Sequence, residues 1–315
     1  MQINAPVLNL TYSNYTPSAG HIERLEALVG QGRVLVAESE QHALELAPTV
    51  EVLLGHRYLS QMLPHAPQLR WIQTTAAGHD QLPFDQIRAR GIILTRNTLN
   101  SDAIAHHALA LTFALTRRLP HAFASQYAGV WSKPWDMLPL PRTALVLGLG
   151  AIGMRIARLL KGLGIYVLGT SRQPRVEQRE VCDECLSMTN WRDALAVSDI
   201  LVLALPLNAE TQHCIGVNEL AMLPAHAVLI NVARGGLIDE KALLQALSNA
   251  QIGGAALDHI DQPWPPEDPA WRTPNLIITP KVSAYHPAMQ SSFETFAEAQ
   301  VSRYLHNQQL HDQVV

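Results

Sequence analysis

The chain has 315 residues, of which 48% are apolar and 16% are charged, and its formal net charge is −4. This length predicts about two domains with sizeable cores. The apolar content excludes a disordered chain, and the lack of a basic excess argues against a nucleic-acid-binding protein. Three cysteines do not make a disulfide framework, and their odd number is weak evidence for a reducing compartment.

The N-terminal segment has no signal-peptide pattern, because Arg24 is its first Arg or Lys and no positively charged region precedes an apolar core. No apolar run reaches the roughly 20 residues that a membrane span needs. We therefore expect a soluble, cytoplasmic protein without a membrane partner.

The first hundred residues predict strands that alternate with helices, as in βαβ units with a parallel sheet. The apolar runs that suggest strands lie at 34–37, 50–55, 69–74 and 91–96. Residues 21–30 have apolar side chains at helical spacing and end on Gly30, which favours a helix with a glycine cap.

A second series begins at Ser101. A long helix is expected to start there and to stop at Pro120; it is apolar on nearly every face, so we expect it to be buried between layers or domains. Predicted strands follow at 143–150, 165–170, 198–205, 227–233, 253–258 and 275–280, and predicted helices at 151–164, 218–224, 240–249 and 287–307. Continuous apolar strands of this kind are typical of sheets buried on both faces.

These patterns predict an α/β protein with two doubly wound parallel-sheet domains. Residues 101–286 form the second of these domains. Residues 1–100 form the other domain, and the helix in 287–315 is expected to pack back on it, which makes that domain discontinuous.

Gly148, Gly150 and Gly153 match the GxGxxG pattern directly after an apolar strand and at the start of a helix. In a dinucleotide-binding turn, the first glycine permits the tight turn and the second lets the backbone approach the pyrophosphate. The third lets helix and strand pack closely. The strand before, the helix after and the next strand are all present, so the sequence predicts bound NAD(P).

The end of the next strand favours NADP(H), with NAD(H) as the second possibility. An NAD site usually has an acidic residue there to bind the ribose hydroxyls, but residues 154–176 contain none. They contain Ser171, Arg172 and Arg175 instead, and a hydroxyl with guanidinium groups suits a 2′-phosphate. The alternative is that both arginines are ordinary solvated loop charges.

Seven segments together resemble the D-isomer-specific 2-hydroxyacid dehydrogenase family. They are LRWIQTTAAGHDQL (69–82), RNTLNSDAIAHHALALTFALTRRLP (96–120), LGLGAIGMRIARLLKGLGIYVLGTSR (147–172), LALPLNAETQHCI (203–215), INVARGGLIDEKALLQAL (230–247), GGAALD (253–258) and PNLIITPKVSAY (274–285). The TSRQPR segment (170–175) is similar to the NADP-preferring glyoxylate/hydroxypyruvate reductase branch.

The resemblance implies a Rossmann-type domain inserted into a discontinuous, flavodoxin-like substrate domain. It implies reduction of a small 2-oxo acid to the D-2-hydroxy acid, a homodimer, and no nucleic-acid partner. Arg234 would bind the substrate carboxylate and carbonyl, and the backbone amides of Ala77 and Gly78 the other end of the carboxylate. The candidate cofactor-binding residues are Ile104, Gly148, Gly150, Ala151, Ile152, Gly153, Ser171, Arg172, Arg175, Leu205, Pro206, Thr211, Val232, Ala233 and Asp258.

The sequence departs from the family at both positions of its Glu–His pair. The TPH motif of the family, whose His donates the proton, reads Thr279-Pro280-Lys281 here. The Glu that orients this His corresponds to Gln262, or to Asp261 if the one-residue gap lies elsewhere. His106 stands where the family often has Glu.

These departures leave several hypotheses for the proton step. A lysine is a charged donor at neutral pH and needs no carboxylate to fix a tautomer, so Lys281 can replace the His without the Glu. His259 and His286 are substitute candidates, although a surface or capping role suits each of them better. The remaining alternatives are a dinucleotide-binding sensor or scaffold without catalysis, and a reductase of another electrophile, such as an imine.

Two smaller patterns carry weaker predictions. Cys182 and Cys185 form a CxxC, but a structural zinc site needs four ligands, so we expect no metal site. Trp131, Trp135 and Trp264 lie in proline-rich loops, where they are candidates for a dimer interface or for covering a cleft, with simple packing as the alternative.

Overall fold

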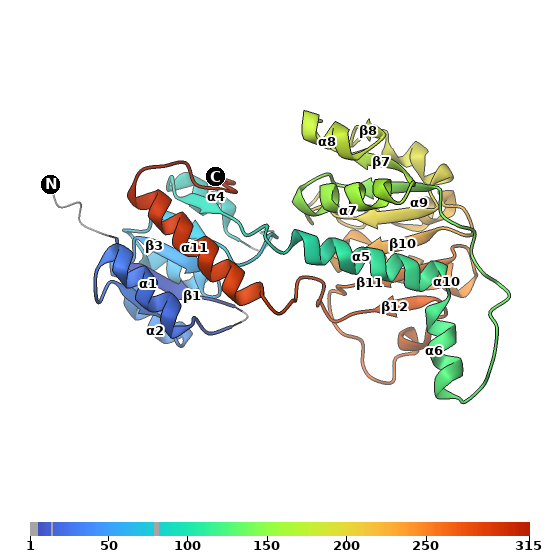
Figure 1. The fold of residues 1–315 in the computed structure, drawn as a ribbon, viewed down its shortest axis with the longest axis horizontal. Helices are drawn as coiled ribbons and strands as arrows, with labels where there is room; N and C mark the ends of the chain where they lie inside the picture. The colour runs from blue at the N-terminus through green and yellow to red at the C-terminus, as the bar shows by residue number, and fades with distance from the viewer. Residues whose placement is uncertain (1–5, 14, 79–81) are drawn as a thin grey trace. The chain divides into compact units, whose positions relative to one another are not determined.

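The computed structural model describes residues 6–13, 15–78 and 82–315. The chain divides into two compact units (Figure 1). Unit 1 consists of residues 1–100 and 286–315, and unit 2 of residues 101–285. Each unit contains one sheet in which all the paired strands are parallel, which confirms the predicted fold class.

Unit 1 has a five-stranded sheet in the order β2-β1-β3-β4-β5, the flavodoxin-like order. Its strands are β1 (Leu8–Thr11), β2 (Val34–Val36), β3 (Val52–Gly55), β4 (Trp71–Gln73) and β5 (Ile93–Thr95). Its helices are α1 (Ala19–Val29), α2 (Glu40–Leu46), α3 (Leu59–Met62), α4 (Phe84–Ala89) and α11 (Met289–Leu305), with 3-10 turns η1 (Ala47–Thr49) and η2 (Leu63–His65). The final helix α11 packs beside α1 on one face, around the buried Phe293 (Figure 1).

Unit 2 has a seven-stranded sheet in the order β12-β11-β10-β9-β6-β7-β8. Its strands are β6 (Thr143–Leu147), β7 (Tyr166–Thr170), β8 (Glu184–Leu186), β9 (Ile200–Leu203), β10 (Val228–Asn231), β11 (Gly254–Leu257) and β12 (Leu276–Ile278). Its helices are α5 (Ser101–Thr116), α6 (Leu119–Tyr127), α7 (Ala151–Gly162), α8 (Val176–Val181), α9 (Val217–Met222) and α10 (Glu240–Ser248), with 3-10 segments η3 (Trp191–Val197), η4 (Gly235–Leu237) and η5 (Pro269–Arg272).

The two faces of the large sheet have separate cores, because successive side chains of a strand point to opposite faces. Ala144 and Val146 of β6 pack with α5 and α7, whereas Leu145 and Leu147 pack with η3, α9 and α10. The helix α5 is therefore buried within its own unit, against α7, β10 and β11. None of the helices in the described parts of the chain is long and apolar enough to span a membrane.

Three local predictions need correction. The helix that begins at Ser101 ends at Thr116, before Pro120, because Arg118 adopts a left-handed conformation with φ 53°. Pro120 then lies in the first turn of α6, where a missing N–H removes no helical hydrogen bond. The strands β1 and β8 were not predicted, because they are short and contain polar residues.

Candidate functional site

The glycine-rich turn joins β6 to α7, and its geometry explains two of the three glycines. Gly148 has φ 98°, and a Cβ there would lie 2.7 Å from the carbonyl oxygen of Ala204. A Cβ on Gly153 would lie 1.9 Å from the carbonyl oxygen of Gly148. At Gly150 a Cβ would meet nothing within 4 Å, so the backbone there borders open space. These are the properties that a pyrophosphate-binding turn requires.

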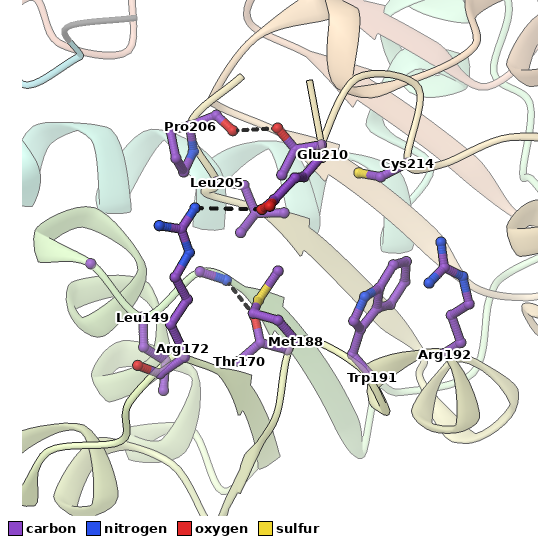
Figure 2. Close-up of a pocket in the computed structure, with 14 residues that line it drawn as sticks. Leu149, Thr170, Arg172, Met188, Trp191, Arg192, Leu205, Pro206, Glu210 and Cys214 are labelled. Atoms are coloured by element: carbon purple, nitrogen blue, oxygen red, sulfur yellow. Dashed lines mark hydrogen bonds and ion pairs between the residues drawn. The ribbon is translucent and has the colours of Figure 1, made fainter. Parts of the chain in front are cut away.

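A pocket of about 390 Å³ lies in front of this turn (Figure 2). It is bounded by the residues that follow β6, β7 and β9, and the strand order reverses between β6 and β9. Open α/β sheets bind their ligands at this kind of switch point. The lining residues are Gly148, Leu149, Gly150, Thr170, Ser171, Arg172, Met188, Trp191, Arg192, Leu205, Pro206, Glu210, Thr211 and Cys214.

Seven of the candidate cofactor-binding residues line this pocket: Gly148, Gly150, Ser171, Arg172, Leu205, Pro206 and Thr211. Thr211 holds the loop after β9, because its hydroxyl donates to the carbonyl oxygen of Pro206 at 2.7 Å. The hydroxyl of Thr170 accepts a hydrogen bond from the amide of Gly148 at 2.8 Å and so fixes the start of the glycine turn.

The other eight candidates do not line the pocket. Ile104 is buried beside α7, Gly153 serves helix packing, and Arg175 caps α8. Ala151 and Ile152 form the first turn of α7. The remaining three follow the neighbouring strands: Val232 and Ala233 after β10, and Asp258 after β11.

The charged residues at the pocket mouth form two ion pairs. Arg172 lies 3.8 Å from Glu210, with both side chains largely exposed (Figure 2). Arg192 contacts Glu219 at 2.7 Å and stacks on the ring of Trp191, 4.6 Å from its centroid. An exposed pair of this kind contributes little stability, so an incoming phosphate can compete for Arg172.

Sequence reasoning missed Arg192, Trp191 and Met188. They follow β8, which is a strand that the sequence analysis did not predict. Glu210, Cys214, Leu149 and Thr170 were also missed, although all four lie inside segments that the resemblance singled out.

A second group of residues in unit 2 brings together Arg234, His259 and Lys281. Arg234 follows β10, and its Nη1 donates to the carbonyl oxygen of Ala233 at 2.9 Å. Partial burial and the positive charges of Lys281 and Arg234 lower the pKa of His259. The amide of Gly235 donates to Nδ1 of His259 at 3.3 Å, which leaves Nε2 as the protonated nitrogen of the neutral ring.

Asp258 holds the turn that carries Lys281. Its buried carboxylate accepts hydrogen bonds from the hydroxyl of Thr279 at 2.6 Å and from the amides of Val282 and Ser283 at 3.0 and 3.1 Å. His107 lies 3.0 Å from the same hydroxyl. Lys281 has an exposed side chain and a left-handed backbone with φ 56°, and its amide donates to the carbonyl oxygen of Asp258 at 2.7 Å.

The two residues that were aligned with the family's Glu differ in their contacts. Asp261 accepts a hydrogen bond at 2.9 Å from the amide of Gly236, two residues after Arg234. Gln262 is exposed, as is His106 on α5. Of the two, Asp261 is therefore the one that fixes the backbone beside Arg234.

Three further candidates lie in unit 1. Ala77 and Gly78 follow β4, where Asn97 donates a backbone hydrogen bond to Ala76 at 3.1 Å and shapes the loop. Residues 79–81 of the same family-like segment lie outside the described residues. His286 contacts the side-chain oxygen of Asn100 at 3.2 Å.

Comparison with known proteins identifies the family. The model of the "D-isomer specific 2-hydroxyacid dehydrogenase, NAD binding domain" matches residues 109–283. Glyoxylate/hydroxypyruvate reductase B of Pectobacterium carotovorum is 35% identical over 243 residues, which cover 74% of this chain and 75% of the relative. The chain therefore belongs to the D-isomer specific 2-hydroxyacid dehydrogenase family, and it is an NAD(P)-dependent oxidoreductase of that family.

Solved structures agree with this assignment. The NADPH-dependent glyoxylate/hydroxypyruvate reductase of Sinorhizobium meliloti, in complex with NADP and malonate, has a TM-score of 0.79 at 25% identity and covers 99% of this chain and 97% of its own. An acyclic imino acid reductase in complex with NADPH and D-Arg has a TM-score of 0.81 at 22% identity, covers 98% of this chain and 100% of its own, and shows the shared fold.

Proposed function

We propose that this protein is an NADP(H)-preferring reductase that converts a small 2-oxo acid, of the glyoxylate or hydroxypyruvate kind, to the D-2-hydroxy acid. The observation that carries the proposal is the cluster of Arg234, His259 and Lys281 beside the strands that continue the dinucleotide-binding sheet. A 2-oxo acid has a carboxylate and a polarisable carbonyl, and both are stabilised by fixed positive groups. The relatives named glyoxylate/hydroxypyruvate reductase support the same substrate class.

Each residue has a separate task in this proposal. Arg234 binds the substrate carboxylate and carbonyl through its planar guanidinium, with the backbone amides of Ala77 and Gly78 as further carboxylate donors. Bound NADPH supplies the hydride. Lys281 donates a proton from its ammonium group to the oxygen that becomes the hydroxyl. Gln262, or Asp261 if the gap lies elsewhere, takes the place of the family's Glu and is not needed to orient an imidazole.

His259 is the second candidate for the proton step. It faces the same two cations, its neutral form is favoured by its lowered pKa, and Nδ1 is already engaged by Gly235. A neutral imidazole donates a proton poorly, whereas a lysine ammonium group is a charged donor. The lysine is therefore the preferred donor, and the two variants Lys281→Met and His259→Gln distinguish them.

The preference for NADP(H) rests on the residues after β7. Ser171 and Arg172 line the pocket, and Arg192 adds a second guanidinium that sequence reasoning did not find. Arg175 does not line the pocket in the structure, so its contribution is the less direct one. A 2′-phosphate at Arg172 would replace the carboxylate of Glu210, which exchanges one exposed anion for a more highly charged one.

The proposal includes a cytoplasmic homodimer. The helix α6 has no buried residue, and the side chains of Tyr127, Trp131 and Trp135 are 94%, 96% and 87% exposed. Aromatic residues are enriched at interfaces, so this surface suits a second copy of the chain. Trp264 behaves differently, because its ring packs against Trp271 at 5.2 Å and its Nε1 donates to Glu240.

The test is the initial rate of NADPH oxidation with glyoxylate, hydroxypyruvate, pyruvate, bulkier 2-oxo acids and an acyclic imine, together with a direct measurement of NADPH binding. Turnover of a 2-oxo acid that is lost in Lys281→Met but not in His259→Gln supports the proposal. Turnover of the imine alone would mean that the electrophile is an imine and not a 2-oxo acid. NADPH binding without any turnover contradicts the enzyme proposal and favours a sensor or scaffold.

A further inference from the structure

The CxxC pair, Cys182 and Cys185, does not line the dinucleotide pocket and belongs to no part of the proposed reaction. Cys182 directly follows α8, and Cys185 lies in β8. Their sulfur atoms are 2.7 Å apart, with Cys182 buried and Cys185 half-buried. Because the two sulfur atoms are already in contact, a covalent bond between them requires little movement of the backbone.

The surroundings of the pair favour thiol chemistry over metal binding. A structural zinc site takes four ligands, and the described residues contain no group of three or more His, Cys, Asp or Glu side chains that could hold a metal. The third cysteine, Cys214, lies in the wall of the pocket. Lys161 lies next to the pair, 3.1 Å from Asp183 and 3.4 Å from the carbonyl oxygen of Cys182.

We propose that Cys182 and Cys185 are a redox modification site that forms a reversible intramolecular disulfide with a low-molecular-weight disulfide, such as oxidised glutathione, as the oxidant. The Cys185 thiolate attacks one glutathione sulfur, the glutathione S–S bond breaks, and one glutathione thiolate leaves. Cys182 then loses its proton and attacks the sulfur of Cys185, which releases the second glutathione. Two protein thiols are oxidised, one glutathione disulfide is reduced, and the two thiol protons pass to the leaving thiolates.

The order of attack follows from the two environments. Burial and the neighbouring Cys185 raise the pKa of the Cys182 thiol to about 12, so this thiol stays protonated in the resting protein. Cys185 is the more accessible sulfur. The more accessible thiol therefore reacts first and the buried one resolves the mixed disulfide, as in other paired-cysteine redox sites. In a reducing compartment such disulfides are typically transient and redox-sensing.

The experiment treats the intact protein with oxidised glutathione, traps free thiols with an alkylating reagent under denaturing conditions, and maps the cysteines by peptide mass spectrometry. We expect a Cys182–Cys185 peptide lighter by two hydrogen atoms, Cys214 alkylated as the internal control, and full reversal by dithiothreitol. The variant Cys182→Ser is expected to keep glutathione on Cys185, because the resolving sulfur is gone.

Two results would overturn the proposal. One is that Cys182 and Cys185 are both found alkylated, although a reference dithiol in the same solution has been oxidised and so shows that the oxidant was active. The other is a disulfide that includes Cys214 or joins two chains in place of the intramolecular pair. Both are read on the wild-type protein, so a variant that fails to fold does not affect them.

Discussion

Replacing Lys281 by glycine is expected to make the protein more stable while it removes the proposed proton donor. The left-handed conformation of Lys281, φ 56°, strains any residue with a Cβ by about 1–2 kcal/mol. Glycine avoids this strain, but its greater freedom in the unfolded chain lowers the free energy of unfolding by about 0.5–1 kcal/mol. The exposed lysine side chain contributes little packing. The net expectation is a gain of up to about 1.5 kcal/mol in the free energy of unfolding.

The assay is urea unfolding followed by tryptophan fluorescence, with the slope m compared between variants so that only midpoint shifts are interpreted. Ala250→Gly is the matched control. Ala250 has nearly the same φ of 52°, is exposed, and follows α10 away from the site. We expect both variants to gain stability, but only Lys281→Gly to lose turnover of the 2-oxo acid. If Lys281→Gly is less stable than the wild type, the strain argument fails, and if it turns over normally, the role of Lys281 fails.

Four further predictions follow from single contacts. Measured by calorimetry, Arg172→Ala is expected to weaken NADPH binding about tenfold and NADH binding much less. Glu210→Gln should tighten NADPH binding. An equal effect of Arg172→Ala on both dinucleotides would contradict a role for Arg172 in binding the phosphate. Asp258→Asn should lower the free energy of unfolding by about 2–4 kcal/mol and reduce kcat, because at least one backbone amide loses its charged acceptor. A loss below about 1 kcal/mol in urea unfolding would argue against this role of the Asp258 carboxylate. Because the pKa of His259 is lowered in the folded protein, the unfolded chain binds the proton at higher pH than the folded chain does. The free energy of unfolding should therefore rise with pH from the folded-state pKa to about 6.5. His259→Gln should flatten that slope. Oxidation of Cys182 removes the S–H that donates to the carbonyl oxygen of Gln178 at 3.0 Å, and the side chain of Gln178 donates to the carbonyl oxygen of Leu149 in the glycine turn at 2.6 Å. NADPH should therefore bind about two- to fivefold more weakly to the oxidised protein. Unchanged binding would show that the cysteine pair is not coupled to the pocket.

The fold was largely predictable because parallel strands buried on both faces leave long apolar runs in the sequence. Residues 143–150 and 227–233 carried that signal, and β6 and β10 lie within them. The strand β1 was missed because Asn9 and Thr11 interrupt its apolar pattern, although both are fully buried in the sheet. Pro120 was misread as a helix stop because proline is equally suited to the first turn of a helix, and only the left-handed Arg118 distinguishes the two cases.

The candidate site was predictable only where one short segment defines it. The sequence by itself determined the glycine turn, the missing acidic residue after β7, and the lysine in place of histidine, because each depends on residue type at fixed spacing. The tertiary structure alone decided that Arg192 joins the pocket, that Asp258 binds the turn of Lys281, and that His259 lies near Arg234 and Lys281. These residues come from different strands of one sheet, and spacing along the chain does not specify which strand ends become neighbours or where their side chains point.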